Sequence, residues 1–176
     1  LSTMYVFNGR TSLPEEDDET DPQTVYGDSK CLGEKFIQES GCEYVILRSS
    51  DYFKEISDIL SLPFTIQNGK TIQTITDHKA SLISSDFLAQ SLLQLLQNNT
   101  HGIYHIASDD ILPTNECIQI ALEHTNNASN YIVESIGSKD FLKPAERLKH
   151  ACLNNNKLKN HLSINSISFE KMLASH

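Results

Sequence analysis

Tyr26 and Lys30 are the residues whose types and spacing first indicate chemistry. They lie four positions apart in the stretch TVYGDSKCLGEKFI, which has the pattern of an amphipathic helix. Because positions i and i+4 share one helix face, the Lys30 ammonium can stabilise a phenolate on Tyr26. The pair could therefore supply a proton to a carbonyl group. The alternative is that both are ordinary surface side chains, since such a pair also arises by chance.

A second pair of candidate residues, Ser2 and Thr3, belongs to the stretch LSTMYVF at the start of the chain. Hydroxyl groups at the carboxyl end of a parallel strand lie where open α/β sheets bind their ligands. One of them could hydrogen-bond the carbonyl oxygen of a substrate. The alternative is that both hydroxyls bond only to backbone groups.

The composition argues against several classes of protein. The chain has 176 residues, 39% of them apolar, and no apolar run as long as a membrane helix. Its formal charge of −9 would repel a nucleic-acid backbone, so we expect neither membrane nor nucleic-acid partners. The four scattered cysteines indicate free thiols in a cytoplasmic protein. His101 and His105 are predicted to diverge along a turn and a strand, so we expect no metal site.

The first fifty residues predict the elements that would position these side chains. A buried strand is expected over 1–7, followed by an acidic loop that solvent surrounds. A helix over 25–40, ended by Gly41, should turn Leu32, Phe36 and Ile37 toward the core. A second strand follows over 42–50. The order strand, loop, helix, strand is typical of an α/β crossover in a parallel sheet.

The rest of the chain predicts further short elements. Asn68-Gly69 is a strong hairpin signal, and a serine before Asp86 should cap a helix whose core face includes Leu96. The full set expected after residue 50 is a short helix at 52–62, a hairpin at 64–75, a helix from Ser84 or Ser85 to Gln97, a strand at 102–108, a helix capped by Thr114 and ending near His124, a strand at 131–136, and helices near 154–161 and 166–174.

Several motifs in order resemble the extended short-chain dehydrogenase/reductase superfamily. STMYVFNG, TVYGDSKCLGE and LRSS are most similar to the dTDP-4-dehydrorhamnose reductase family, also called RmlD-like substrate-binding. GIYHIAS and KPAERLKHACLNNNKL continue the resemblance downstream. It implies an α/β fold: the C-terminal part of a Rossmann-like parallel sheet plus a small α+β substrate-binding lobe. Residues 1–50 would form the Rossmann-like half and 51–176 mainly the lobe, with 80–107 returning to the sheet.

The resemblance also implies catalytic roles for the two pairs. Tyr26 would protonate the C4 oxygen of a nucleotide-linked 4-keto-6-deoxysugar, and Thr3 would hold that oxygen. Lys30 would support the proton transfer and, with Tyr26, bind the ribose of NADPH or NADH. The cofactor would supply the hydride, so the protein's part is positioning and proton supply.

Other roles implied by the resemblance concern binding. Arg48, Ser49 and Ser50 would run beside the nicotinamide. Met4 and Tyr5 would line the sugar site, where Met4 replaces an aspartate of the family. Arg147 would reach the nucleotide diphosphate, a task that suits a planar fork of donors, although a surface ion pair is an equal alternative. These substrate-binding positions are Met4, Tyr5 and Arg147.

Two departures leave a second function open. The sequence lacks the glycine-rich turn of the family, so we expect a fragment or truncated chain that does not bind NAD(P)H alone. Met4 also puts substrate handling in doubt. The alternative is a non-catalytic binding protein of the same fold, similar to the regulatory subunit of methionine adenosyltransferase. A homodimer or a partner enzyme is then an expected partner.

Overall fold

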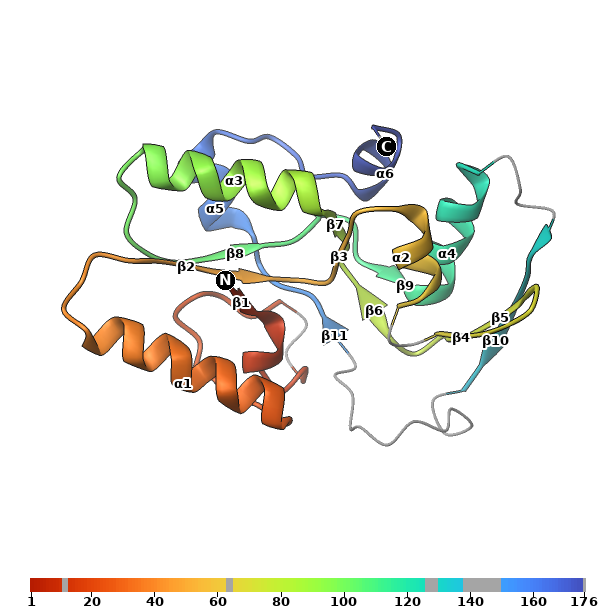
Figure 1. Ribbon diagram of the computed structural model, residues 1–176, viewed down its shortest axis with the longest axis horizontal. Coiled ribbons are helices and arrows are strands. Elements are labelled where there is room, and N and C mark those ends of the chain that lie inside the picture. The colour runs from red at the N-terminus through yellow and green to blue at the C-terminus, as the bar shows by residue number, and fades with distance from the viewer. Residues whose placement is uncertain (11–12, 63–64, 126–129, 138–149, 176) are drawn as a thin grey trace.

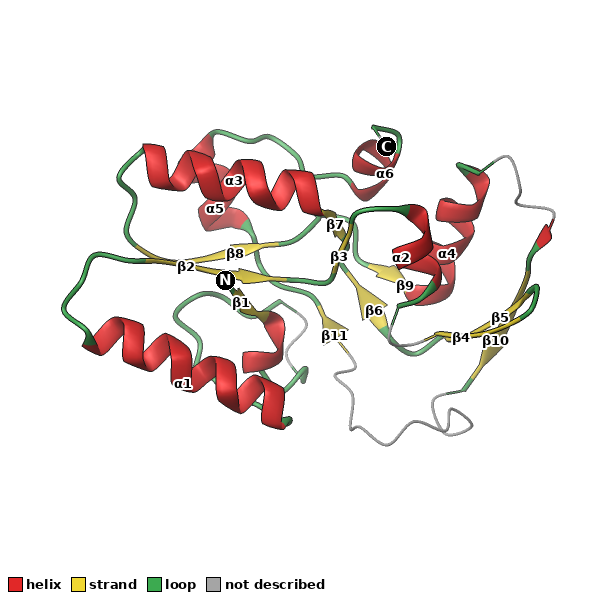
Figure 2. Cartoon of the chain, viewed as in Figure 1, coloured by secondary structure: helices red, strands yellow, loops and turns green. Residues whose placement is uncertain are grey.

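A three-stranded parallel sheet forms the centre of the larger lobe (Figures 1 and 2). The computed structural model describes residues 1–10, 13–62, 65–125, 130–137 and 150–175. The sheet has the order β1 (Ser2–Thr3), β2 (Val45–Ser49) and β8 (Gly102–Ile106). Thr3 pairs with Ser49, which in turn pairs with Ile106. The parallel α/β arrangement expected from the sequence is confirmed.

Helices cover both faces of this sheet (Figure 1). The helix α1 (Val25–Glu39) lies on one face, and α3 (Ser85–Gln97) and α5 (Asn156–Leu162) lie on the other. Local capping explains the boundaries, which agree closely with the prediction. The Thr24 hydroxyl accepts the Gly27 N–H at 3.0 Å, and the Ser84 hydroxyl accepts that of Phe87 at 3.1 Å. Gly41 follows α1 with φ of 73°, a conformation that glycine adopts most easily.

The prediction of one strand over residues 1–7 is wrong. Only Ser2 and Thr3 are extended, and the 3₁₀ helix η1 (Met4–Val6) follows directly. The chain turns where the sheet ends, and the Thr3 hydroxyl accepts the Tyr5 N–H at 3.4 Å. Met4 and Val6 become buried in a small apolar cluster with Phe7. Met4 and Val6 therefore belong to a 3₁₀ helix that packs against the sheet, and not to one of its strands.

The predicted core face of α1 is also wrong. Its buried or half-buried positions are instead small or polar ones: Gly27, Lys30, Cys31, Gly33 and Glu34. The three apolar side chains predicted to face the core are 52%, 63% and 44% exposed for Leu32, Phe36 and Ile37. An arginine of β2 accounts for this choice, because it draws the Glu34 carboxylate inward as an ion pair.

The smaller lobe packs around an apolar cluster that includes Phe53, Ile59, Ile72, Ile118 and Phe169. A three-stranded sheet of order β10-β5-β4 contains the hairpin predicted at Asn68-Gly69. The remaining elements are β3 (Tyr52–Phe53), α2 (Ile56–Leu60), β4 (Thr65–Asn68), β5 (Thr71–Ile75), β6 (Lys79–Ala80), β7 (Ile83–Ser84), β9 (Leu112–Pro113), α4 (Thr114–Glu123), β10 (Ile132–Ile136), β11 (His150–Ala151) and α6 (Phe169–Leu173).

Two details of these helices differ from the prediction. Thr114 is the first residue of α4 and Pro113 takes the cap position, so Thr114 does not cap the helix. The Thr114 hydroxyl instead lies 2.8 Å from Nδ1 of His78 in the interior. Leu96 of α3 is 55% exposed, whereas Leu95 is fully buried against the sheet. The prediction of Leu96 on the core face is therefore wrong by one position around the helix.

Candidate active site

The structure places Tyr26 and Lys30 in the first two turns of α1, beside the strand β1. Lys30 Nζ lies 5.8 Å from the centroid of the Tyr26 ring. The same nitrogen donates to the carbonyl oxygen of Leu1 at 3.3 Å. The Tyr26 side chain is about half exposed. The ammonium and the phenol therefore share one helix face, and the phenol can meet a molecule from solvent.

Close packing fixes the start of α1 against η1. A Cβ on Gly27 would overlap the carbonyl oxygen of Tyr5 and would lie 2.9 Å from Cβ of Pro22. Only glycine therefore allows this approach. The rings of Tyr5 and Tyr26 meet edge to face, with centroids 6.0 Å apart. Tyr5 thus contacts Tyr26 directly, and Gly27 is a packing position of this candidate site that the sequence analysis missed.

Thr3 lies under this helix at the end of β1, only 7% exposed. Its hydroxyl accepts the Tyr5 N–H, a bond that leaves its own proton available to an acceptor. The neighbouring Ser2 hydroxyl donates to the carboxylate of Glu34. Thr3 and Tyr26 therefore belong to adjoining elements, and Tyr5 lies between them in the chain.

The polar side chains of the LRSS stretch, Arg48, Ser49 and Ser50, have hydrogen-bond partners within the protein. Ser49 Oγ donates to the Ser50 carbonyl at 2.6 Å, and Ser50 Oγ donates to the Ser81 carbonyl at 2.5 Å. The Arg48 guanidinium bonds to Glu34 and to the Glu16 carbonyl inside the protein. Arg147 lies outside the described residues.

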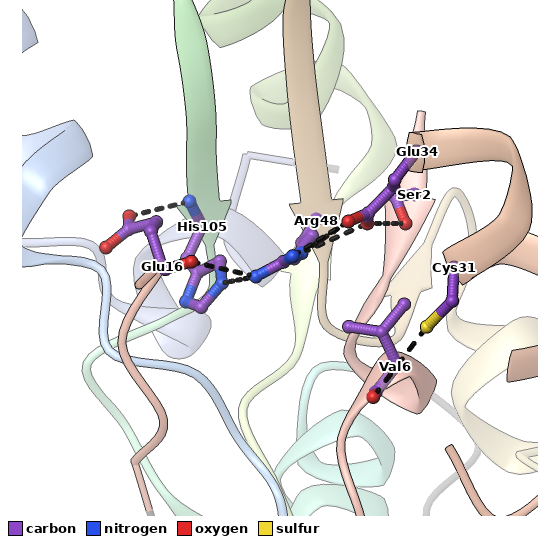
Figure 3. A network of polar contacts seen from close by, with 7 residues as sticks. All are labelled: Ser2, Val6, Glu16, Cys31, Glu34, Arg48 and His105. Carbon is purple, nitrogen blue, oxygen red and sulfur yellow. Dashed lines mark hydrogen bonds and ion pairs between the residues drawn. The ribbon is translucent and has the colours of Figure 1, made fainter. Parts of the chain in front are cut away.

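Arg48 is the centre of a buried polar network, the Arg48 network, that also contains Ser2, Glu16, Glu34 and His105 (Figure 3). Nε lies 3.0 and 3.2 Å from the two carboxylate oxygens of Glu34, and Nη2 lies 2.7 Å from one of them. Nη1 donates to the Glu16 carbonyl at 3.1 Å and lies 3.4 Å from Nε2 of His105. The side chains of Arg48 and Glu34 are only 4% and 7% exposed.

Burial sets the charge states around Arg48. Burial, together with the nearby Arg48 guanidinium, lowers the pKa of His105 to about 3, so the ring is neutral at pH 7. Burial also raises the pKa of Glu16, although the hydrogen bond from the His105 backbone opposes this effect. Arg48 and Glu34 are therefore paired beside a neutral imidazole.

The sequence predicts an acidic loop that solvent surrounds, and this prediction is wrong for Glu16. Glu16 is buried, and its carboxylate accepts the His105 N–H at 2.9 Å. Pro14, Asp18 and Glu19 of the same loop line a pocket of about 250 Å³, together with Met4, Phe7, Asn8, Gly9, His150 and Cys152. The loop is thus one wall of a cavity beside η1, and Glu16 anchors it.

Asp51 is a further ionisable group that the sequence analysis did not select. It is the second residue after β2, at the carboxyl end of the parallel sheet. Its Oδ2 atom is buried without a hydrogen-bond partner among the described residues. Burial raises the pKa of Asp51 to about 6. A carboxyl group after the LRSS motif was visible in the sequence, but its burial was not.

In the described part of the chain, no group of three or more His, Cys, Asp or Glu side chains is arranged to hold a metal ion. None of the helices in the described ranges is long and apolar enough to cross a membrane.

Comparison with known families gives a match over the whole chain. The model of the family described as RmlD substrate binding domain matches residues 1–176. A probable low-salt glycan biosynthesis reductase of Haloferax volcanii is 28% identical over 181 residues, which cover 98% of this chain and 60% of that protein. The dTDP-4-dehydrorhamnose reductase of Salmonella typhimurium is 22% identical over 93% of this chain and 58% of its own length.

Solved structures show the same fold. The crystal structure of dTDP-4-dehydrorhamnose reductase from Bacillus anthracis, in complex with NADP, matches with a TM-score of 0.85 and 23% identity. The match covers 99% of this chain and 62% of that one. The chain thus spans about three-fifths of the length of these relatives. The Rossmann-like α/β fold expected from the sequence is confirmed.

Proposed function

The chain belongs to the RmlD substrate binding domain family. From this membership we propose that it acts as an NAD(P)H-dependent reductase of a nucleotide-linked 4-keto-6-deoxysugar. Reductases of glycan and dTDP-4-dehydrorhamnose metabolism among its relatives support the proposal. The Rossmann-like half at 1–50 and the substrate lobe over most of 51–176 remain part of this proposal. We also propose that the protein is located in the cytoplasm.

Three side chains carry the proposed proton transfer. Tyr26 donates the proton to the C4 oxygen, Thr3 hydrogen-bonds that oxygen, and Lys30 stabilises the phenolate that forms. The observation that carries the proposal is the shared helix face of Tyr26 and Lys30 above β1, with the phenol half exposed. A phenol with no access to solvent could not reach a substrate.

The chemistry of the same residues fits a nicotinamide cofactor. An ammonium has three donors, and among the described residues Lys30 makes one hydrogen bond, to a carbonyl at 3.3 Å. Its other donors and the Tyr26 hydroxyl suit the hydroxyls of a ribose. The bound cofactor would supply the hydride. Ser49 and Ser50 keep their proposed place beside it, and Tyr5 and Arg147 keep theirs beside the nucleotide sugar.

The role that we propose for Arg48 differs from the one that the resemblance implied. All three guanidinium nitrogens already have partners within the protein. A place beside the nicotinamide would have to use its aliphatic stem or its backbone. Its guanidinium suits a supporting role.

One observation favours the alternative of a non-catalytic binding protein. Met4, where the family has an aspartate, is 2% exposed and packs with Val6 and Phe7. It offers the substrate no carboxylate next to Thr3. A protein of this kind could still bind a nucleotide sugar, a second copy of itself or a partner enzyme.

Turnover separates the two functions. The full-length protein, incubated with NADPH and dTDP-4-dehydrorhamnose, the ketone that the names of its relatives state, should consume NADPH, followed by absorbance at about 340 nm. Tyr26→Phe should lower kcat at least ~10²-fold, because it removes the proton donor. Tyr44→Phe, just before the amino end of β2, is the matched control and should leave kcat unchanged. Binding of the nucleotide sugar without any NADPH consumption would support the binding protein instead.

A further inference from the structure

Four segments of the chain meet at the Arg48 side chain of β2. Through its guanidinium, Arg48 bonds to α1 at Glu34 and to the acidic loop at the Glu16 carbonyl. The Glu34 carboxylate also contacts β1, because it accepts a hydrogen bond from the Ser2 hydroxyl. His105 of β8 completes the set (Figure 3). The Arg48 network thus connects both proposed site elements, the Tyr26 helix and the Thr3 strand, to the middle strand of the sheet.

The helix α1 has few other means of keeping its orientation. In the described structure its buried residues are only Gly27 and Glu34. Its large apolar side chains face outward, with Val25 at 86% and Phe36 at 63% exposed. Apolar packing, which holds helices elsewhere in this fold, contributes little here. Lys30 Nζ and Cys31 Sγ add two longer contacts, to the carbonyl oxygen of Leu1 at 3.3 Å and to that of Val6 at 4.0 Å. The several charge-assisted bonds of Glu34, together with the close approach at Gly27, are the strongest of the contacts that set how α1 is rotated about its axis.

We propose that Arg48 is the positioning residue of this site, acting through Glu34 to hold the Tyr26–Lys30 face of α1 over Thr3. Glu34 follows Lys30 by one helical turn and Tyr26 by two, so a rotation at Glu34 moves the phenol with it. Ser2, on the same carboxylate, precedes Thr3 in β1. One ion pair therefore controls both partners of the proposed proton transfer. The catalytic consequence rests on the proposed function.

The chemistry of the pair suits this task. A guanidinium and a carboxylate bind through several short, charge-assisted hydrogen bonds with a fixed mutual direction. An ammonium at the same place would act as a point charge and would fix the direction less well. Since a misplacement of about 1 Å can cost about 10²-fold in rate, directional bonds matter where a proton is transferred.

The first test reads the position of Tyr26 without any enzymatic assay. Fluorotyrosine is placed at position 26, and its ¹⁹F NMR signal is recorded in wild type, Arg48→Met and Arg48→Lys. The signal should shift or broaden in Arg48→Met as the edge-to-face contact with Tyr5 changes, and Arg48→Lys should restore it partly. If the signal is the same in all three proteins, the proposal is wrong.

A double variant guards against simple unfolding. Arg48→Met alone leaves the Glu34 carboxylate buried and unpaired, whereas Glu34→Leu with Arg48→Met removes both charges and can retain the fold. The folded double variant should still show the displaced signal. A wild-type signal from it would mean that packing alone places Tyr26, which overturns the proposal. Lys159→Met, which breaks the partly exposed Lys159–Asp109 pair of 2.6 Å, is the matched control and should leave the signal unchanged.

The second test separates positioning from substrate binding. In full-length enzyme, the double variant should lower kcat about 10²-fold while KM changes less than about 3-fold. KM should hold because the pocket loop keeps other bonds, such as Glu16 Oε1 to the His105 N–H. A higher KM with unchanged kcat would contradict the proposal. If the wild type itself reduces no keto-sugar, the proposed function fails, and the ¹⁹F signal alone decides the positioning role.

Discussion

The two faces of the sheet β1-β2-β8 hold their helices by different forces. On the α3 and α5 face, Leu47, Leu95, Tyr104 and Leu158 form a continuous apolar core. On the α1 face, the buried centre is the Arg48 network, with a small apolar cluster beside it. Apolar contacts stabilise without direction, whereas an ion pair with several hydrogen bonds fixes one geometry. The directional face is the one that carries the proposed proton donor.

The largest effect should come from breaking the pair on the polar face. Glu34→Gln leaves the Arg48 charge buried without its partner, so the free energy of unfolding should fall by about 3–5 kcal/mol. Urea unfolding measures it. Lys35→Gln is the matched control on the same helix, because Lys35 and Glu39 form an exposed pair at 3.8 Å. Its loss should stay below about 0.5 kcal/mol. Equal losses in the two variants would show that burial of the pair does not matter.

The apolar face should respond in stability but not in the position of Tyr26. Leu95→Ala removes a fully buried side chain and should cost about 3 kcal/mol. The fluorotyrosine signal at position 26 should nevertheless remain that of the wild type. Leu96→Ala, one residue on at a half-exposed position, should cost less than about 0.5 kcal/mol. A shifted signal in Leu95→Ala would mean that the two faces are coupled.

Two glycines of α1 sharpen the comparison within one helix. Gly27→Ala forces a Cβ against the Tyr5 backbone and should cost about 1–3 kcal/mol. It should also displace the Tyr26 signal. A Cβ on Gly33 meets nothing within 4 Å, so Gly33→Ala should raise stability by about 1 kcal/mol through helix propensity. A gain at both positions would show that α1 does not press on η1.

The smallest effect is the pH dependence of the polar face. The pKa of His105 is about 3 in the folded protein and about 6.5 when unfolded, so acid protonates the unfolded chain first. The contribution of His105 to the free energy of unfolding is fully present above pH 6.5 and is lost as pH falls toward 3. Between pH 8 and 5.5 the loss should be about 1.4 kcal/mol.

The histidine contribution is isolated by comparing wild type with His105→Gln in urea at both pH values. Glu16, whose pKa is raised, acts in the opposite direction and remains in both proteins. If His105→Gln keeps the wild-type pH dependence, the buried imidazole is not the source.

Much of the local structure could be predicted from the sequence because short-range chemistry determines it. Ser84 caps α3 through its own hydroxyl, and Gly41 ends α1 with a positive φ. The hairpin forms at the predicted place, one residue further on: Asn68 pairs with Thr71, and Gly69-Lys70 makes the turn. Tyr26 and Lys30 share a face because their spacing matches the helical repeat. Each of these features depends on residues within about one turn of each other.

Tertiary structure alone decided which side of α1 is buried and which residue of the acidic run is internal. Hydrophobicity favoured Leu32, Phe36 and Ile37, yet Glu34 is the side chain drawn inward. Its partner Arg48 is 14 residues away on another element, beyond the reach of any helical pattern. A buried charge must be paired, so the position of one guanidinium outweighed the apolar spacing of the helix.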